Sequence, residues 1–281
     1  MKMSRYLIMK QARSLLMLPL LFVAVPAKAL TLEGDYVQGG MLVGQVKSGE
    51  RVRMNGKPVK VAKDGVFLLG FGRDAPLDHE LVVSGGQRPD QVKRFSITKR
   101  DYRIQRIDGL PASKVTPPER DWDRIKQEAV LVKQARKLNE DRNDFQSGFI
   151  WPAKGVISGV YGSQRILNGK PRRPHYGVDI AAPVGTLVVS PADGVVTLTH
   201  SDMFYSGGTL IVDHGLQLSS SFLHLHKILV REGQKVKQGD PIAEIGATGR
   251  VTGAHLDWRM NLGSARIDPQ LLVPPMPEKR H

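Results

Sequence analysis

Residues 185–200 read GTLVVSPADGVVTLTH, and residues 207–223 read GGTLIVDHGLQLSSSFL. In both stretches, short apolar runs rich in Val, Leu and Ile are separated by turns that contain glycine. Many short strands with glycine turns between them are typical of an antiparallel β barrel or sandwich. We therefore predict that residues 149–273 form one mainly β domain, followed by a proline-rich, charged tail over residues 274–281.

A second, smaller β region precedes this domain, over residues 30–111. Its apolar runs are interrupted at Asn55-Gly56 and Asp64-Gly65, and these residue pairs tolerate the positive backbone angles of two-residue hairpin turns. We predict a small β-sandwich here. It contains no catalytic constellation, so we interpret it as a spacer or an accessory contact module. The predicted strands are residues 41–43, 51–54, 59–61, 66–69, 81–83 and 95–97.

A helical connector is predicted over residues 112–148. Thr116 is placed as the cap, Pro117 as the first helical residue and Glu119 as the residue that returns the capping hydrogen bond. Apolar residues then recur at spacings of three and four, which gives one apolar stripe along a helix. This stripe predicts packing against a neighbouring domain. Its members are Trp122, Ile125, Ala129, Val132 and Ala135.

The first 29 residues have the pattern of a secretory signal. Basic residues come first, an apolar run covers residues 15–25, and Ala27-Lys28-Ala29 provides small residues for cleavage. The apolar run is about half the roughly 20 residues that span a bilayer. We expect cleavage after Ala29, no transmembrane span in the mature chain, and a periplasmic or secreted location.

Composition narrows the classes of partner. The chain has 41 Lys and Arg residues against 27 Asp and Glu residues, a formal net charge of +14. A basic exported protein is attracted to anionic envelope polymers. The signal pattern and the lack of an aromatic-interleaved basic motif argue against nucleic acid as the partner. There is no cysteine, so disulfides and thiolate metal sites are excluded.

Three clusters that contain histidine fall within the larger β domain. His175 and Asp179 are four residues apart, so both point to one side of an extended chain. His224-Leu225-His226 and His255-Leu256-Asp257 each place two polar residues on one strand face. Neutral imidazole and carboxylate are suitable zinc ligands, which makes this set a candidate metal site.

The order of motifs resembles the lysostaphin/LytM-type zinc endopeptidases, over about 120 residues. The resemblance implies a LytM-type β domain, one Zn²⁺ ion and hydrolysis of peptide cross-links in bacterial peptidoglycan. The amino-terminal β-sandwich followed by a helix is similar to Gram-negative members of the family. The motifs that carry the resemblance are Gly159–Gly162, His175–Asp179, Gly185-Thr186, Ala192–Val196, Phe222–Leu225, Glu232–Ile242, Gly246–Gly249 and Thr252–Leu256.

The resemblance also implies roles for individual residues. His175 and Asp179 match the first two zinc ligands of the family. His224 and His255 match the two histidines that flank the reacting water. The third ligand of the family is the second histidine of a His-x-His motif, and this position is Asp257 here.

The substitution at Asp257 changes the charge of the predicted site. A carboxylate oxygen is a competent zinc ligand, so His175, Asp179 and Asp257 leave a fourth position for water. Two anionic ligands make the ion a weaker Lewis acid than a two-histidine site does. His226 is a weaker candidate for a replacement ligand.

Two further residues are weak candidates for the substrate groove. Tyr161 and Arg165 lie near the start of the larger domain, where a packing tyrosine and a solvated arginine are equally good interpretations. The sequence leaves open which cross-link is cleaved, the oligomeric state and inhibition by the amino-terminal region.

Two functions remain in competition. The favoured one is a zinc-dependent endopeptidase used in cell-wall remodelling or division, because four of the five site positions keep the family residue. The alternative is a catalytically degenerate LytM-type domain that activates or binds another cell-wall hydrolase or division protein.

Overall fold

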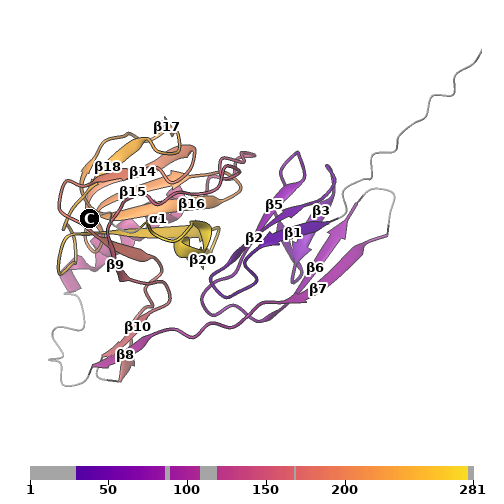
Figure 1. Ribbon diagram of the computed structural model, residues 1–281, viewed down its shortest axis with the longest axis horizontal. Helices are drawn as coiled ribbons and strands as arrows, with labels where there is room; N and C mark the ends of the chain where they lie inside the picture. Colours follow the sequence, from indigo (N-terminus) through magenta and orange to yellow (C-terminus); the bar gives the residue numbers. More distant parts are fainter. Residues whose placement is uncertain (1–29, 86–88, 108–118, 168, 278–281) are drawn as a thin grey trace, which may run out of the picture.

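The computed structural model describes residues 30–85, 89–107, 119–167 and 169–277, so the predicted signal over residues 1–29 lies outside the described residues. The prediction of a mainly β chain with a connecting helix is confirmed. Among the described residues there is one α-helix, and the strands form two β regions and one further small sheet (Figure 1). No helix within the described ranges is long and apolar enough to cross a membrane.

The amino-terminal β region consists of two sheets that enclose one apolar core. The first sheet has the order β1 (Thr31–Gly34), β2 (Met41–Gln45), β5 (Val66–Gly70), and the second has the order β4 (Lys57–Val59), β3 (Arg51–Met54), β6 (Asp78–Ser84), β7 (Gln91–Ser96). Leu42 and Phe67 of the first sheet share a buried cluster with Val52 and Leu81 of the second. This arrangement is the predicted β-sandwich.

The predicted hairpin turn at Asn55-Gly56 is confirmed. Asn55 and Gly56 have φ angles of 50° and 75°, and they connect β3 to β4 in antiparallel register. Both residues occupy the left-handed region, as a two-residue turn that matches the twist of its strands requires.

A small sheet joins parts of the chain that the sequence pattern assigned to different regions. β8 (Ile104–Ile107) pairs in parallel with β10 (Gln164–Leu167), which pairs in turn with β11 (Lys170–Pro171). Figure 1 shows this sheet away from the two larger β regions. The pairing of β8 with β10 was not predicted, because strand partners distant in sequence leave no local pattern.

The larger β region is built on one long antiparallel sheet. Its main path has the order β17-β14-β15-β16-β19-β12-β9, while β13, β18 and β20 pair beside this path. On one face, Leu210, Phe222 and Trp258 belong to the main buried core. The bounds are β9 Val156–Gly159, β12 Val178–Ala181, β13 Leu187–Val189, β14 Gly194–Met203, β15 Gly207–Asp213, β16 Leu218–Ile228, β17 Lys235–Val236, β18 Pro241–Ile245, β19 His255–Leu262 and β20 Ala265–Ile267, with a 3-10 helix at Pro269–Leu272.

Helix α1 (Trp122–Ala135) covers part of the opposite face of this sheet. Val132 and Ala135 pack against a small cluster formed by Leu198, Met203 and Ile211. The predicted packing of the apolar stripe is therefore confirmed for these two members. At the other end of the helix, Trp122 is exposed.

The described start of α1 follows a short 3-10 turn. A 3-10 turn covers Glu119–Asp121, and the helix cap is Asp121, which makes no side-chain capping hydrogen bond. Thr116 and Pro117, where the start was predicted, lie outside the described residues. The helix is therefore fixed at this end by ion pairs of Arg124 with Glu128 and Asp202 rather than by a capping box.

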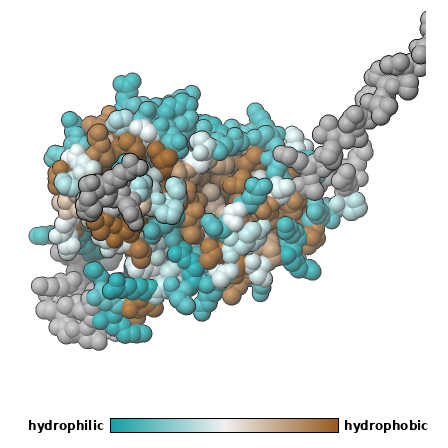
Figure 2. Space-filling view, in the orientation of Figure 1, coloured by the Kyte–Doolittle hydropathy of each residue, from teal (hydrophilic) through white to brown (hydrophobic). Residues whose placement is uncertain are grey.

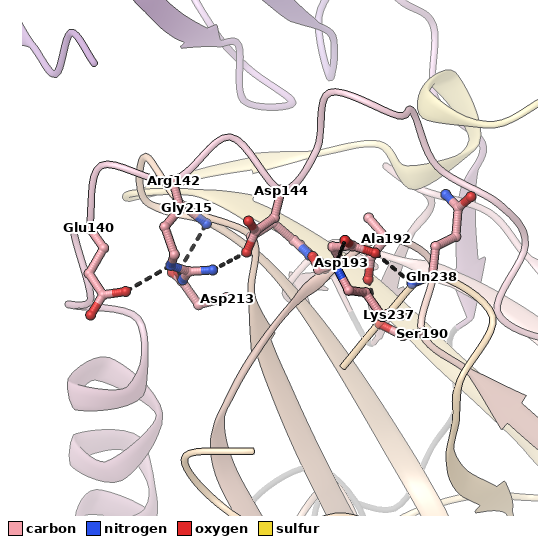
Figure 3. A network of polar contacts seen from close by, with 11 residues as sticks. Glu140, Arg142, Asp144, Ser190, Ala192, Asp193, Asp213, Gly215, Lys237 and Gln238 are labelled. Carbon is pink, nitrogen blue, oxygen red and sulfur yellow. Dashed lines mark hydrogen bonds and ion pairs between the residues drawn. The ribbon is translucent and has the colours of Figure 1, made fainter. Parts of the chain in front are cut away.

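The segment after α1 is fixed to the end of the large sheet by charged contacts (Figure 3). Arg142 pairs with Glu140, Asp144 and the buried carboxylate of Asp213. The backbone of Gly215 lies against Arg142, so close that a Cβ on Gly215 would overlap the Arg142 carbonyl. The connector is thus part of the packed structure.

The two β regions also contact each other directly. Arg100 of the amino-terminal region pairs with the buried Asp268 at 2.8 Å, and Arg73 Nε donates to the Gly162 carbonyl at 2.8 Å. Gly70 of β5 lies against Leu262. On the face drawn in Figure 2, hydrophobic residues gather between the two β regions.

Candidate metal centre

Two adjacent strands bring the candidate metal ligands together. Asp179 of β12 is the direct cross-strand partner of Asp257 of β19, so their carboxylates point to the same face of the sheet. His255 is two residues before Asp257 on β19 and shares this face. Helix α1 packs on this same face. Leu223 of β16 is the partner of Asp257. Ser221, two residues before Leu223, is the partner of Ile211, which belongs to the cluster against which α1 packs.

Two glycines provide room for these carboxylates. A Cβ on Gly159 would overlap the carboxylate of Asp179, and a Cβ on Gly177 would overlap that of Asp257. Glycine at both positions is therefore required by the close approach of the acidic side chains to the backbone.

His175, just before β12, completes a three-residue group. Its Nε2 atom lies 3.1 Å from Asp179 Oδ1, and the ligand atoms of His175, Asp179 and Asp257 all lie within 4.8 Å of one another. His175 Nε2 and Asp179 Oδ1 are both buried, and neither has a hydrogen-bond partner. Buried polar atoms require partners, and a divalent cation between them would satisfy both, so these residues fit the zinc ion that the family implies.

The carboxylate of Asp257 has a partner that the sequence analysis missed. Arg259 Nε donates to Asp257 Oδ1 and Oδ2 at 3.0 Å each, and its Nη2 donates to Oδ2 at 2.5 Å. Asp257 is 2% exposed. Burial opposes the charge of Asp257, but the Arg259 guanidinium outweighs burial and lowers the pKa of the carboxyl. Asp257 and Arg259 therefore form a buried, charge-assisted pair.

This pair changes the charge of the donor set. Two carboxylates and one imidazole carry −2, and the guanidinium of Arg259 brings the group to −1. One carboxylate with two neutral imidazoles carries the same charge. The added negative charge of Asp257 is thus compensated within the site. Asp257 Oδ1 accepts only one of these hydrogen bonds and keeps a further lone pair for a cation. A signal for this residue was present in the sequence, because Arg259 follows Asp257 at a strand spacing of two.

His224 and His255 face each other beside this group. Their ring centroids are 4.9 Å apart, and His255 Nε2 is 3.8 Å from Asp179 Oδ1. His224 Nδ1 is 2.9 Å from the Thr248 carbonyl, and His255 Nδ1 is 2.9 Å from the Gly253 carbonyl. A carbonyl oxygen only accepts, so both protons are on Nδ1, and the Nε2 atoms keep free lone pairs.

His224 is held in an uncommon conformation. It is 7% exposed and has a φ angle of 66°, a region that costs free energy for a residue with a side chain. Burial lowers the pKa of His224, which keeps the imidazole neutral at neutral pH. A strained, buried and neutral histidine beside a metal-ligand group is suited to accept a proton.

The remaining predicted residues lie away from the group. Tyr161 is buried, and its hydroxyl donates to the Arg266 carbonyl at 2.7 Å; these contacts give it a packing role and no support for a role in the groove. Arg165 is exposed on β10. His226 is exposed on β16, outside the group formed by His175, Asp179 and Asp257.

Comparisons with known proteins agree with this site. Peptidase family M23 matches residues 173–269, a range that contains all five site residues. A Pseudomonas aeruginosa crystal structure assigned to peptidase M23 shares 30% sequence identity and a TM-score of 0.65, and the alignment covers 85% of this chain and 95% of that one.

Two curated relatives match shorter parts. Peptidoglycan DD-endopeptidase ShyA of Vibrio cholerae is 46% identical over 87 residues, which are 31% of this chain and 20% of ShyA. The lipoprotein NlpD/LppB homolog of Pseudomonas aeruginosa is 33% identical over 127 residues, which are 45% of this chain and 40% of that protein. The chain therefore spans less than half the length of either relative. The match to the M23 structure over nearly its whole length confirms the resemblance seen in the sequence, and the chain belongs to peptidase family M23.

Proposed function

We propose that this protein is a zinc-dependent endopeptidase that hydrolyses peptide cross-links of peptidoglycan. The observation that carries the proposal is the convergence of His175, Asp179 and Asp257 beside the free Nε2 atoms of His224 and His255. The similarity to a protein named peptidoglycan DD-endopeptidase supports the choice of substrate.

Each residue has a defined task in this proposal. His175, Asp179 and Asp257 would hold the zinc ion, which supplies a Lewis acid that polarises a carbonyl and lowers the pKa of water. The Nε2 atom of His224 accepts the proton of the attacking water, since its imidazole is neutral. His224 then passes this proton to the nitrogen of the leaving amine as the C–N bond breaks. His255, on the opposite side, orients the water. No covalent intermediate is needed.

A second candidate function rests on the Asp257–Arg259 pair. If Arg259 competes with zinc for Asp257, the domain keeps its fold and acts by binding another cell-wall hydrolase or a division protein. The similarity to a lipoprotein NlpD/LppB homolog and to a cell division protein, DipM of Caulobacter vibrioides, is compatible with this function.

A digest of purified peptidoglycan separates the two candidates. The protein is incubated with sacculi in the presence of zinc or of a chelator, and the released muropeptides are separated by chromatography. The endopeptidase proposal expects cross-linked dimers to disappear only with zinc, and His224→Ala to prevent this. Persistence of the dimers with a folded protein that binds no zinc overturns the endopeptidase proposal and favours the binding function.

We also propose the location and domain boundaries predicted from the sequence. Cleavage after Ala29 would release a periplasmic or secreted protein with a sandwich over residues 30–111, a connector over residues 112–148 and a peptidase domain over residues 149–273. Mass spectrometry of the protein purified from the periplasm tests the cleavage site, and limited proteolysis tests the boundaries. A mature chain that begins elsewhere, or cuts inside these ranges, contradicts the assignment.

A further inference from the structure

His224 lies in a stretch of β16 that contains one residue more than the strand beside it. Gly208 of β15 pairs with Leu225 of β16. Leu210, two residues further along β15, pairs with Phe222, which is three residues away from Leu225. The extra residue makes a β-bulge, which changes the direction of a side chain. His224 lies within this bulge and has the φ angle of 66°.

The bulge turns His224 toward the candidate metal centre. Leu223 is the cross-strand partner of Asp257, so its side chain lies on the sheet face of the metal centre. In a regular strand, the next side chain would point to the opposite face. The ring of His224 instead lies 4.9 Å from the ring of His255, on the face of the metal centre. The proposed role of His224 therefore depends on this backbone conformation.

Two backbone carbonyls hold His224 in this conformation. The backbone N–H of His224 donates to the Ser206 carbonyl at 2.8 Å, and His224 Nδ1 is 2.9 Å from the Thr248 carbonyl. The segments that contain these carbonyls are in contact, because a Cβ on Gly207 would overlap the backbone of Thr248. An uncommon φ angle persists only where the surrounding structure enforces it. The turn over residues 204–206, between β14 and β15, is therefore part of the support of His224.

Helix α1 holds this turn through the carboxylate of Glu128. Both oxygens of Glu128 accept from the backbone N–H of Phe204, at 3.1 and 2.9 Å, and a charged acceptor strengthens a hydrogen bond. The side chain of Glu128 is 12% exposed, so little water competes for these bonds. Arg124, one helical turn earlier, pairs with Glu128 and with Asp202, two residues before Phe204. The turn is thus fixed to the connector helix.

We propose that Glu128 is a positioning residue for His224. Glu128 fixes the backbone of Phe204. Two residues later, the Ser206 carbonyl accepts from the backbone N–H of His224. Loss of the Glu128 carboxylate frees this turn, so the strained backbone relaxes and the imidazole leaves the position that its role requires. The connector helix is then part of the catalytic apparatus, an inference that rests on the proposed function of His224 as proton acceptor.

The NMR signals of His224 in the zinc-free protein test this positioning without turnover. Protein with isotope-labelled histidine is measured in chelator, and the signals of His224 are assigned by their loss in His224→Ala. We expect its backbone N–H and Nδ1–H signals to shift or broaden in Glu128→Ala. Glu128→Gln keeps a side-chain oxygen that accepts from Phe204, so its spectrum should match that of the wild type. Asp123→Ala, which removes a 90% exposed acid of the same helix, should also match.

Kinetics of the zinc-loaded protein provide the catalytic readout, with a soluble cross-linked muropeptide dimer as substrate. Glu128→Ala should lower kcat at least about tenfold, since a catalytic group misplaced by about 1 Å can cost about 10²-fold in rate. KM and zinc content should stay unchanged, because Glu128 contacts neither the metal ligands nor the substrate in this proposal. Glu128→Gln should recover most of the lost kcat, and Asp123→Ala should be as active as the wild type.

Unchanged His224 signals in Glu128→Ala overturn the inference even where kcat falls, and so does an unchanged kcat in an active enzyme. If Glu128→Ala does not fold, Glu128→Asp replaces it, because the shorter side chain draws the carboxylate away from Phe204 and keeps its charge. A wild type that cleaves no dimer rejects the proposed function, and the NMR comparison then decides alone whether Glu128 holds His224.

Discussion

Asp257 and Arg259 lie two residues apart on one face of β19 and form a buried ion pair that uses both carboxylate oxygens. The cross-strand partner of Asp257 is Asp179, so the guanidinium compensates one of two closely spaced carboxylates. Without Arg259, this part of the sheet would contain two negative charges that repel each other at a buried position. The pair therefore stabilises the fold before any metal binds, and it determines how strongly a metal is attracted.

The substitution Arg259→Met removes the guanidinium and keeps an unbranched side chain. Without metal, we expect the free energy of unfolding at pH 7 to fall by about 3–5 kcal/mol, because a buried charge loses its partner. Added zinc should stabilise the variant more than the wild type, since the unpaired carboxylate attracts a divalent ion more strongly. Urea denaturation with zinc and with chelator measures both effects. The double variant Asp257→Asn/Arg259→Met is the control, and in chelator it should lose less stability than Arg259→Met does. Equal stability of Arg259→Met and the wild type would show that the pair contributes nothing.

The two histidines beside the metal group should be needed for turnover and not for zinc retention. We expect His224→Ala and His255→Ala each to reduce the rate of dimer cleavage by about 10²–10⁴-fold, the usual loss for a general acid or base. Zinc content, measured by mass spectrometry after gel filtration, should stay unchanged in both. His226→Ala is the matched control, because His226 is exposed on the same strand as His224 and should keep full activity. Loss of zinc in His224→Ala would instead make His224 a ligand.

Much of the fold was predictable because local patterns encode it. The apolar runs and the Asn55-Gly56 turn predicted strands β2 to β7, and the spacing of Val132 and Ala135 predicted the packed helix. Strand β8 was missed, because its partner β10 lies 60 residues away along the chain and pairing between distant strands depends on tertiary structure. The predicted helix start at Thr116 and Pro117 lies outside the described residues, and a 3-10 turn at Glu119–Asp121 is the first described part of the helix.

The sequence predicted which residues form the candidate site, but it did not predict the charges that surround them. A spacing of two on β19 brought His255 and Asp257 to one face, and the register of β12 placed Asp179 opposite. Of the cations, Arg259 has a signal in its spacing of two from Asp257, but Arg136 has none. Arg136 approaches from a different element, and its contact with Ser221 depends on how α1 crosses the sheet. Tyr161 was a weak candidate for the groove because of its position in the sequence, with packing as the equal alternative; it lies in the turn between β9 and β10 and is buried.

The buried His214 should make stability depend on pH. His214 Nδ1 is 2.7 Å from the Asp193 carbonyl, and its Nε2 is 2.8 Å from Ser220 Oγ; burial lowers its pKa to about 4. The unfolded chain, with a pKa near 6.5, binds more protons than the folded chain between these values, so this contribution is lost as pH falls from about 6.5 to 4. Over this pH range the free energy of unfolding should fall by about 3 kcal/mol. Urea midpoints of the wild type and His214→Gln from pH 7 to pH 4 test this, and parallel pH profiles of the two proteins would contradict it.

Arg142 should fix the connector to the sheet by its pairing with the buried Asp213 (Figure 3). In Arg142→Met we expect a loss of about 3–5 kcal/mol in the free energy of unfolding at pH 7, because Asp213 is left buried without a cation. Burial raises the pKa of Asp213 to about 6. This folded pKa lies above the unfolded value near 3.8, so protonation of Asp213 favours the folded state as pH falls through 6. The loss of unfolding free energy in Arg142→Met should therefore be smaller at pH 5 than at pH 7. Arg94→Met, which removes a surface arginine that pairs with Glu80, should cost less than about 1 kcal/mol at either pH. Equal penalties for Arg142→Met at pH 7 and pH 5 would show that the charge of Asp213 is not what Arg142 stabilises.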